Sequence, residues 1–138
     1  MKTEIIYSVE NNLNPEEFRE VLIDSTLGER RPVEYIQQIE KMVENANLIV
    51  TARENGILAG VARSITDFVY CTYLSDLAVR LSYQKKGIGK ELIRKTKIES
   101  LPAKLILLSA PAAIDYYPKI GMIKHNHCFI LDDVNSLT

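Results

Sequence analysis

The sequence predicts one mixed α/β (α+β) domain over residues 1–138, in which helices pack on a mixed sheet. Two observations lead to this prediction. The apolar and polar patterns give the element order β-α-α-β-β-β-α-β-α-β, and a chain of 138 residues that is 46% hydrophobic can bury one substantial core. No internal repeat, low-complexity tract or linker divides the chain.

The first third of the chain predicts a strand followed by two helices. The strand is expected over residues 2–9. Asn14 and Pro15 then form a cap and a first-turn proline, and the helix that they begin should end near Gly28. A second helix is expected from a similar start at Pro32. The letters GERRP between the two helices predict an exposed, charged loop.

The middle of the chain predicts three consecutive strands. Residues 47–53 and 57–65 flank Asn55 and Gly56, and Asn-Gly between apolar runs is a strong hairpin signal. Residues 69–79 alternate in character, with Val69, Cys71, Tyr73, Leu77 and Val79 on one parity, so we expect a long central strand.

The last third predicts two more helices and two more strands. A helix is expected over residues 87–100, closed by Pro102, and a strand covered on both faces over residues 104–109. A short helix should occupy residues 110–120, and a last strand residues 122–131.

Charge and cysteine content favour a soluble cytoplasmic protein. The net charge of −1 gives no reason to expect nucleic acid as a partner, and no apolar run reaches the ~18 residues of a membrane span. Cys71 and Cys128 lie far apart, each in an apolar stretch, which predicts reduced core residues in place of a disulfide.

The stretch SYQKKGIGKELI, residues 82–93, predicts an anion site. It lies between a strand and a helix, so several backbone N–H groups should point outward, unpaired, at the positive end of a helix dipole. Gly87 and Gly89 would let a phosphate approach those groups. Three lysines add local positive charge: Lys85, Lys86 and Lys90. The alternative is a tight turn with a solvated lysine face.

Two common phosphate loops do not fit this stretch. A P-loop requires Ser or Thr after Gly-Lys, and here Glu91 follows Lys90. A dinucleotide fingerprint requires a third glycine at the position of Leu92.

The segment from Val79 to Gly89 resembles the acyl-CoA motif of the GNAT superfamily of N-acetyltransferases, whose core is Gln/Arg-x-x-Gly-x-Gly/Ala after a strand. The segment from Tyr116 to Met122 (YYPKIGM) resembles the family's aromatic-Tyr-x-x-x-Gly-Phe segment. The resemblance implies a mostly antiparallel, twisted sheet of about six strands with helices on both faces. Two features depart from the family pattern: Pro118 lies inside its fourth helix, and the chain after Gly121 has room for one final strand in place of two.

The resemblance also implies where acetyl-CoA, the cosubstrate, would bind. Backbone groups of the central strand would hold the pantetheine arm, and the amides of the glycine loop would hold the pyrophosphate. The implied binding residues are Leu77, Ala78, Val79, Gln84, Lys85, Lys86, Gly87, Ile88, Gly89 and Lys90. Lys90, Arg94 and Lys97 share a helix face that either reaches the remaining phosphate or is simply solvated.

The chemistry implied by the family is direct acetyl transfer to a primary amine of a small molecule or protein, with no metal. A backbone N–H near Leu77 would stabilise the oxyanion, and Tyr117 would protonate the departing thiolate, while Tyr116 packs. The alternative for Tyr117 is that both tyrosines only pack in the core or on the surface. Asp76 is the candidate base; the alternatives are a structural role for this carboxylate and an ordered water as base. Tyr73 would line the acceptor pocket or the core.

Other readings stay open at this point. A different class of function is a non-catalytic acyl-CoA-binding or interaction module. Arg30 and Arg31 either bind a carboxylate on the acceptor or lie on the surface, and His125 and His127 lack a visible third metal ligand. The expected partners are acetyl-CoA and an amine, without nucleic acid or membrane, and a homodimer is left open.

Overall fold

The computed structural model describes residues 3–138, which form two compact units. The first ends at Leu108, and the second is Ser109–Thr138. The single domain expected over residues 1–138 stays a prediction.

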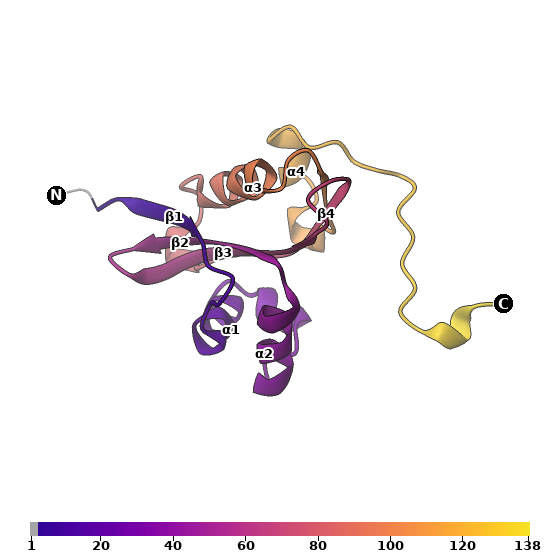
Figure 1. The fold of residues 1–138 in the computed structure, drawn as a ribbon, viewed down its shortest axis with the longest axis horizontal. Helices are drawn as coiled ribbons and strands as arrows, with labels where there is room; N and C mark the ends of the chain where they lie inside the picture. Colours follow the sequence, from indigo (N-terminus) through magenta and orange to yellow (C-terminus); the bar gives the residue numbers. More distant parts are fainter. Residues whose placement is uncertain (1–2) are drawn as a thin grey trace. The chain divides into compact units, whose positions relative to one another are not determined.

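The first unit is a five-stranded sheet with helices on both faces (Figure 1). In spatial and chain order its strands are β1 (Ile5–Val9), β2 (Leu48–Glu54), β3 (Ile57–Thr66), β4 (Cys71–Val79) and β5 (Lys104–Leu107). Neighbours are antiparallel except β4 and β5, which are parallel. The predicted fold class is confirmed, with five strands where about six were expected.

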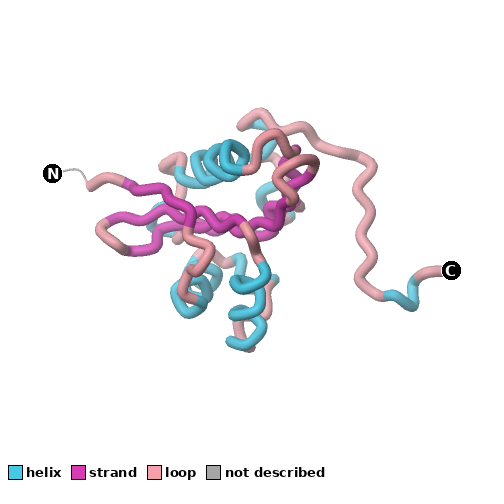
Figure 2. Tube along the Cα trace, viewed as in Figure 1, coloured by secondary structure: helices cyan, strands magenta, loops and turns pink. Residues whose placement is uncertain are grey.

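The helices divide the first unit into two cores. Helices α1 (Pro15–Asp24) and α2 (Ile36–Asn45) lie on one face of the sheet, and α3 (Ile88–Glu99) lies on the other (Figure 2). The core under α1 and α2 includes Phe18, Leu22, Ile39, Ile49, Val61 and Ala78. The core under α3 includes Leu48, Val50, Ala62, Leu74, Ile88 and Leu92.

Two local signals act as the sequence predicts. The Asn14 side-chain oxygen accepts hydrogen bonds from the N–H groups of Glu16 and Glu17, at 2.8 and 3.2 Å, which caps α1. Asn55 and Gly56 both have positive φ, at 50° and 81°. This pair of angles is the type I′ turn that joins two antiparallel strands, here β2 and β3.

The predicted limits of the first two helices need correction. Helix α1 ends at Asp24 instead of near Gly28, and a 3₁₀ turn, η1 (Leu27–Arg30), follows it. Helix α2 begins at Ile36, because the residues from Pro32 to Tyr35 close a turn in which the Tyr35 N–H donates to the Pro32 carbonyl at 3.1 Å. The loop between the helices is therefore partly ordered.

The predicted parity of β4 is broken by a bulge. Arg63 of β3 pairs with Asp76, but Ser64 pairs with Leu74, so Ser75 is one extra residue in β4. The extra residue reverses the alternation. Leu77 therefore packs in the same core as Leu74, and Tyr73 lies on a different face from Leu77.

The end of the first unit also differs from expectation. Strand β5 is short and lies at the edge of the sheet, and Ile106 is 45% exposed, so β5 is not covered on both faces.

Cys71 and Cys128, predicted in the core, are both exposed. Within residues 3–138, no helix is long and apolar enough to cross a membrane.

The second unit holds less regular structure than the sequence predicts. Residues 110–120 form a 3₁₀ turn, η3 (Pro111–Ala113), and one helical turn, α4 (Tyr116–Lys119), which contains a proline that cannot donate a backbone hydrogen bond. The strand expected over residues 122–131 is absent, because no backbone ladder pairs this segment and Phe129 is 92% exposed. A last 3₁₀ turn, η4, is Val134–Ser136.

Candidate active site

Strand β4 leaves its parallel neighbour partway along its length. The last pair that joins it to β5 is Leu74 with Leu107. Past this pair β4 continues to Val79, and the residues from Asp76 to Val79 stay paired with β3 on the other side. In the part of the chain that the structure describes, this segment therefore has a strand edge without a ladder partner.

The free edge of β4 presents the polar groups of Leu77 and Val79. The Arg80 N–H donates to the Ala59 carbonyl of the β3 side at 2.9 Å, so residue 80 points toward β3. Because the bonded positions alternate along an antiparallel pair, residues 77 and 79 direct their N–H and C=O groups to the opposite side. The Val79 carbonyl does accept a hydrogen bond there, from the Gln84 side chain at 2.9 Å.

The loop that follows β4 leaves a row of amides free. The Gln84 N–H donates to the Leu81 carbonyl at 3.2 Å, and the next amide with a partner among residues 3–138 is that of Glu91, which donates to the Gly87 carbonyl at 3.1 Å. The N–H groups of residues 85–90 therefore have no partner in the described chain. They lie at the N-terminus of α3, where the helix dipole favours an anion.

The backbone angles explain why a glycine precedes the helix. Gly87 is the N-cap of α3 with φ of 82°, and a side-chain β-carbon added there would meet nothing within 4 Å. Open space therefore surrounds this position of Gly87, and another residue would adopt the left-handed conformation at a cost of roughly 1–2 kcal/mol. Lys85 adopts it too, with φ of 63°.

Side chains tether this loop to the sheet. The Tyr83 hydroxyl donates to the Glu54 carboxylate of β2 at 3.0 Å, and this bond raises the pKa of Tyr83. The Lys86 ammonium lies over the Tyr83 ring, 5.5 Å from its centroid. The Arg80 guanidinium donates to the Leu58 carbonyl at 2.6 Å. The loop is therefore held in place before any ligand binds.

Asp76 is fully buried, and its carboxylate forms ion pairs with two arginines. One carboxylate oxygen accepts a hydrogen bond from Arg31 and the other from Arg63. The carboxylate has no solvent-exposed surface, and both of its oxygens already accept from guanidinium groups, so the contacts favour the structural alternative that the sequence left open. Arg31 is not free to bind an acceptor, whereas the Arg30 side chain is exposed.

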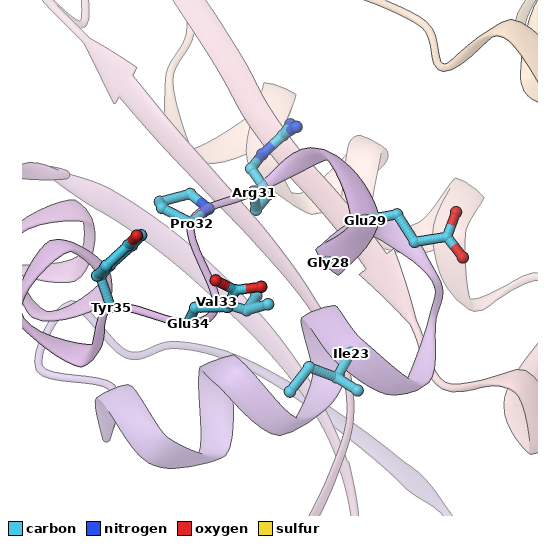
Figure 3. A pocket seen from close by; sticks show the side chains of 8 residues that line it. All are labelled: Ile23, Gly28, Glu29, Arg31, Pro32, Val33, Glu34 and Tyr35. Atoms are coloured by element: carbon cyan, nitrogen blue, oxygen red, sulfur yellow. The ribbon is translucent and has the colours of Figure 1, made fainter.

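A hollow of about 570 Å³ adjoins this network (Figure 3). It lies at the end of α1 and along the loop to α2, and it is lined by Ile23, Gly28, Glu29, Arg31, Pro32, Val33, Glu34 and Tyr35. Arg31 is part of this wall and also contacts β4 at the bulge, because its guanidinium donates to the Ser75 carbonyl at 2.8 Å. The Arg31 side chain therefore links the wall of the hollow to the bulge of β4.

The structure brings most of the predicted site residues together at one junction. Leu77, Ala78 and Val79 end β4, and residues 84–90 lead directly from it into α3. The bulge at Ser75 and the part played by Arg63 were not predicted. An arginine in the otherwise apolar run ILAGVARSI was the available signal, since a buried arginine requires an acid.

Tyr117 belongs to the second unit, where it is the second residue of α4. It is half-buried, and burial raises its pKa above the ordinary value of 10, with a further contribution from Tyr116. The two rings meet edge to face with centroids 5.3 Å apart. Tyr117 is therefore protonated at neutral pH, as a proton donor must be.

The histidines of the second unit also lie close to each other. The His127 backbone N–H donates to His125 Nδ1 at 3.0 Å. No group of three or more possible metal ligands occurs within residues 3–138.

The chain belongs to the GNAT acetyltransferase family. The family model described as acetyltransferase (GNAT) domain matches residues 9–134. The chain is similar to two curated proteins named uncharacterized N-acetyltransferase ycf52, from Pyropia yezoensis (26% identity over 88% of this chain) and Gracilaria tenuistipitata var. liui (25% over 75%). It spans 71% and 59% of their lengths. The predicted enzyme class, an acetyltransferase, is confirmed.

Solved structures share the fold at low identity. An aminoglycoside N-acetyltransferase, AAC(6')-Iy, in complex with CoA matches with a TM-score of 0.73 at 13% identity, over 97% of both chains. The same enzyme was also solved with a bisubstrate analogue, CoA-S-monomethyl-acetylneamine. A GNAT family acetyltransferase from Streptococcus pneumoniae TIGR4 matches with a TM-score of 0.67 at 16% identity, over 94% of this chain and 100% of the other.

The free amides at the start of α3 lead to a prediction for Gly89→Val. Gly89 is the second residue of α3, outside the positive-φ region, so valine fits the backbone but places its branched side chain among these amides. Acetyl-CoA should raise the Tm of the native protein, because it binds only the folded state, and this rise should be absent in Gly89→Val.

The matched control is Glu99→Val, which places the same side chain at the exposed end of α3. It should keep the full rise in Tm in a thermal shift measurement. A rise in Gly89→Val as large as that in the control would contradict the assignment of the loop.

Proposed function

We propose that this chain transfers an acetyl group from acetyl-CoA to a primary amine by direct attack in a ternary complex. The observation that carries the proposal is the continuity of two features: a free edge on β4 leads into a row of unpartnered amides at the start of α3. An extended thioester arm can pair with the first, while its pyrophosphate binds the second. The CoA complexes of AAC(6')-Iy, which shares the fold, support this cosubstrate.

The proposed binding residues follow this path. The pantetheine arm would lie along Leu77, Ala78 and Val79, bonding to backbone groups that point away from β3. The pyrophosphate would bind the amides of residues 85–90, with Lys85, Lys86 and Lys90 compensating its charge. Gln84 holds the Val79 carbonyl and so orients the end of the strand.

The proposed reaction has three steps. The amine nitrogen attacks the thioester carbonyl carbon, and the Leu77 N–H on the free edge stabilises the oxyanion. The carbon–sulfur bond then breaks, and the Tyr117 hydroxyl protonates the leaving thiolate. An ordered water takes the proton of the amine, because the Asp76 carboxylate is already bound on both oxygens.

We place the acceptor in the hollow beside the α1–α2 loop. Arg31 lines the hollow and also donates to the Ser75 carbonyl in the bulge of β4. An amine bound in the hollow would therefore lie next to the segment proposed to bind the thioester. Glu29 and Glu34 line the hollow with exposed carboxylates, and Ile23 and Val33 add apolar surface.

The alternative function is a module that binds acyl-CoA without turnover. The protonated, half-buried Tyr117 favours catalysis, since simple binding requires no proton donor. The two functions separate in a thiol-release assay with acetyl-CoA and a panel of primary amines, combined with calorimetric titration of CoA. Turnover on at least one amine supports the enzyme, whereas binding without turnover on any amine supports the module.

The buried contacts of Asp76 predict that Asp76→Asn is mainly a stability mutation. The change leaves two arginines without their counter-charge, which costs about 3 kcal/mol in the free energy of unfolding. Urea denaturation should show this loss. The fall of kcat/KM toward low pH (the acid limb of the profile) should be the same in the folded variant as in the native protein, because water remains the base. Disappearance of that limb with little loss of stability would assign the base role to Asp76.

The raised pKa of Tyr117 predicts the effect of Tyr117→Phe. A tyrosine donates only while it is protonated, so the donor is present at neutral pH and is lost as pH rises through its raised pKa, above 10. Tyr117→Phe should keep CoA affinity and lower kcat roughly ten- to a thousand-fold at neutral pH. Tyr116→Phe is the matched control and should change kcat much less. Equal, small effects of the two changes would rule out Tyr117 as the acid.

A further inference from the structure

The bulge in β4 leaves two polar groups in need of hydrogen-bond donors: the Ser75 carbonyl and the Asp76 carboxylate. An extra residue in a strand loses its place in the ladder, so the carbonyl of Ser75 needs a partner other than β3. Directly after it lies Asp76, whose carboxylate is completely buried. A buried acceptor without a donor costs roughly 1–3 kcal/mol, and more when it is charged. A stable bulge therefore requires hydrogen-bond donors for both the carbonyl and the carboxylate.

Arg31 satisfies both groups with one side chain. Its Nε donates to one oxygen of Asp76, and its Nη2 donates to the Ser75 carbonyl at 2.8 Å. The third nitrogen, Nη1, donates to the Arg30 carbonyl at 2.9 Å and so orients the guanidinium from its own loop. All three nitrogens are thus used, in the planar geometry that only arginine provides.

Arg63 completes the arrangement from the other side. It donates to the second oxygen of Asp76 and, through Nη2, to the Ser75 hydroxyl at 3.0 Å. Its Nη1 donates to the Met42 carbonyl of α2 at 3.1 Å. Arg63 would suffice to neutralise the carboxylate, since it is the partner directly across the ladder. The carboxylate alone therefore does not explain the presence of Arg31.

We infer that Arg31 is a positioning residue that locks the β4 bulge to the wall of the acceptor hollow. The bulged residue directly follows Leu74, the last residue of β4 that pairs with β5, and the extra residue sets the side of the strand to which the Leu77 amide points. Arg31 lines the hollow and holds the bulged carbonyl, so the acceptor-side loop and the thioester-side strand keep one fixed relation. The inference rests on the proposed acetyl transfer for its kinetic part, and its structural part stands without it.

Arg31→Met tests the inference, with Arg31→Lys as the conservative variant. Methionine keeps an unbranched apolar stem like that of arginine but removes every donor. Lysine keeps the charge that faces Asp76, but its single nitrogen lacks the fork that reaches both groups. Arg30→Met is the matched control for exchange and stability, because that exposed side chain takes no part in the contacts at the bulge.

The first readout is amide hydrogen exchange, which requires no acceptor. In Arg31→Met, exchange in peptides that cover residues 72–79 should rise at least about tenfold over the native protein, with little change in residues 48–54 of β2. The exchange rate of Arg31→Lys over residues 72–79 should lie between those of the native protein and Arg31→Met, and the rate of Arg30→Met should match that of the native protein. If exchange over residues 72–79 rises no more in Arg31→Met and Arg31→Lys than in Arg30→Met, the inference is wrong.

The second readout separates positioning from simple loss of stability. With an amine that the native protein acetylates, Arg31→Met should lower kcat/KM for the amine at least about tenfold, while the Kd of CoA changes less than about threefold. A variant whose Tm falls while this kinetic ratio stays native would show a purely structural role and overturn the inference. If Arg31→Met does not fold, Arg31→Lys decides in both measurements. If the native protein acetylates no amine, the proposed function is wrong. The exchange measurement would still decide the role of Arg31.

Discussion

The bulge at Ser75 is the constraint on which the rest of the site depends. One extra residue in β4 turns Leu77 and Val79 into the core under α3, and it lies directly after the last pair of β4 with β5. The same irregularity leaves a carbonyl and a carboxylate buried, and two arginines from different elements supply their donors. A free strand edge is ordinarily a liability in a sheet, so its retention here indicates a use.

The second constraint is the junction between β4 and α3. A helix that begins directly after a strand leaves its first amides without partners, and these groups are costly unless water or a ligand binds them. Gly87 accepts the left-handed conformation that the turn requires, and Tyr83 fixes the loop to β2 through Glu54. The edge and the amides follow each other along the chain, so one extended ligand can use both without rearranging the protein. This continuity suits a long molecule with a charged end, such as a CoA thioester.

Local signals in the sequence predicted most of the first unit, whereas contacts between distant residues were not predictable. Asn14 with Pro15, Asn55 with Gly56, and the glycine loop each act through their own backbone geometry, and all three are found as expected. The bulge is different, because the alternation of β4 looks regular until its partner Arg63 is known. The partners of Asp76 lie 13 and 45 residues away, beyond the reach of periodicity. The strand expected over residues 122–131 fails for the same reason, since apolar residues alone do not form a strand without a neighbour to pair with.

The most direct test of this account is an NMR titration of the isotope-labelled protein with acetyl-CoA, followed at the backbone amides. The account predicts that the largest shift changes fall on Leu77, Val79 and the amides of residues 85–90, with little change in β1 and α2. Binding that shifts another set of amides and leaves the edge of β4 and the start of α3 unchanged would contradict it.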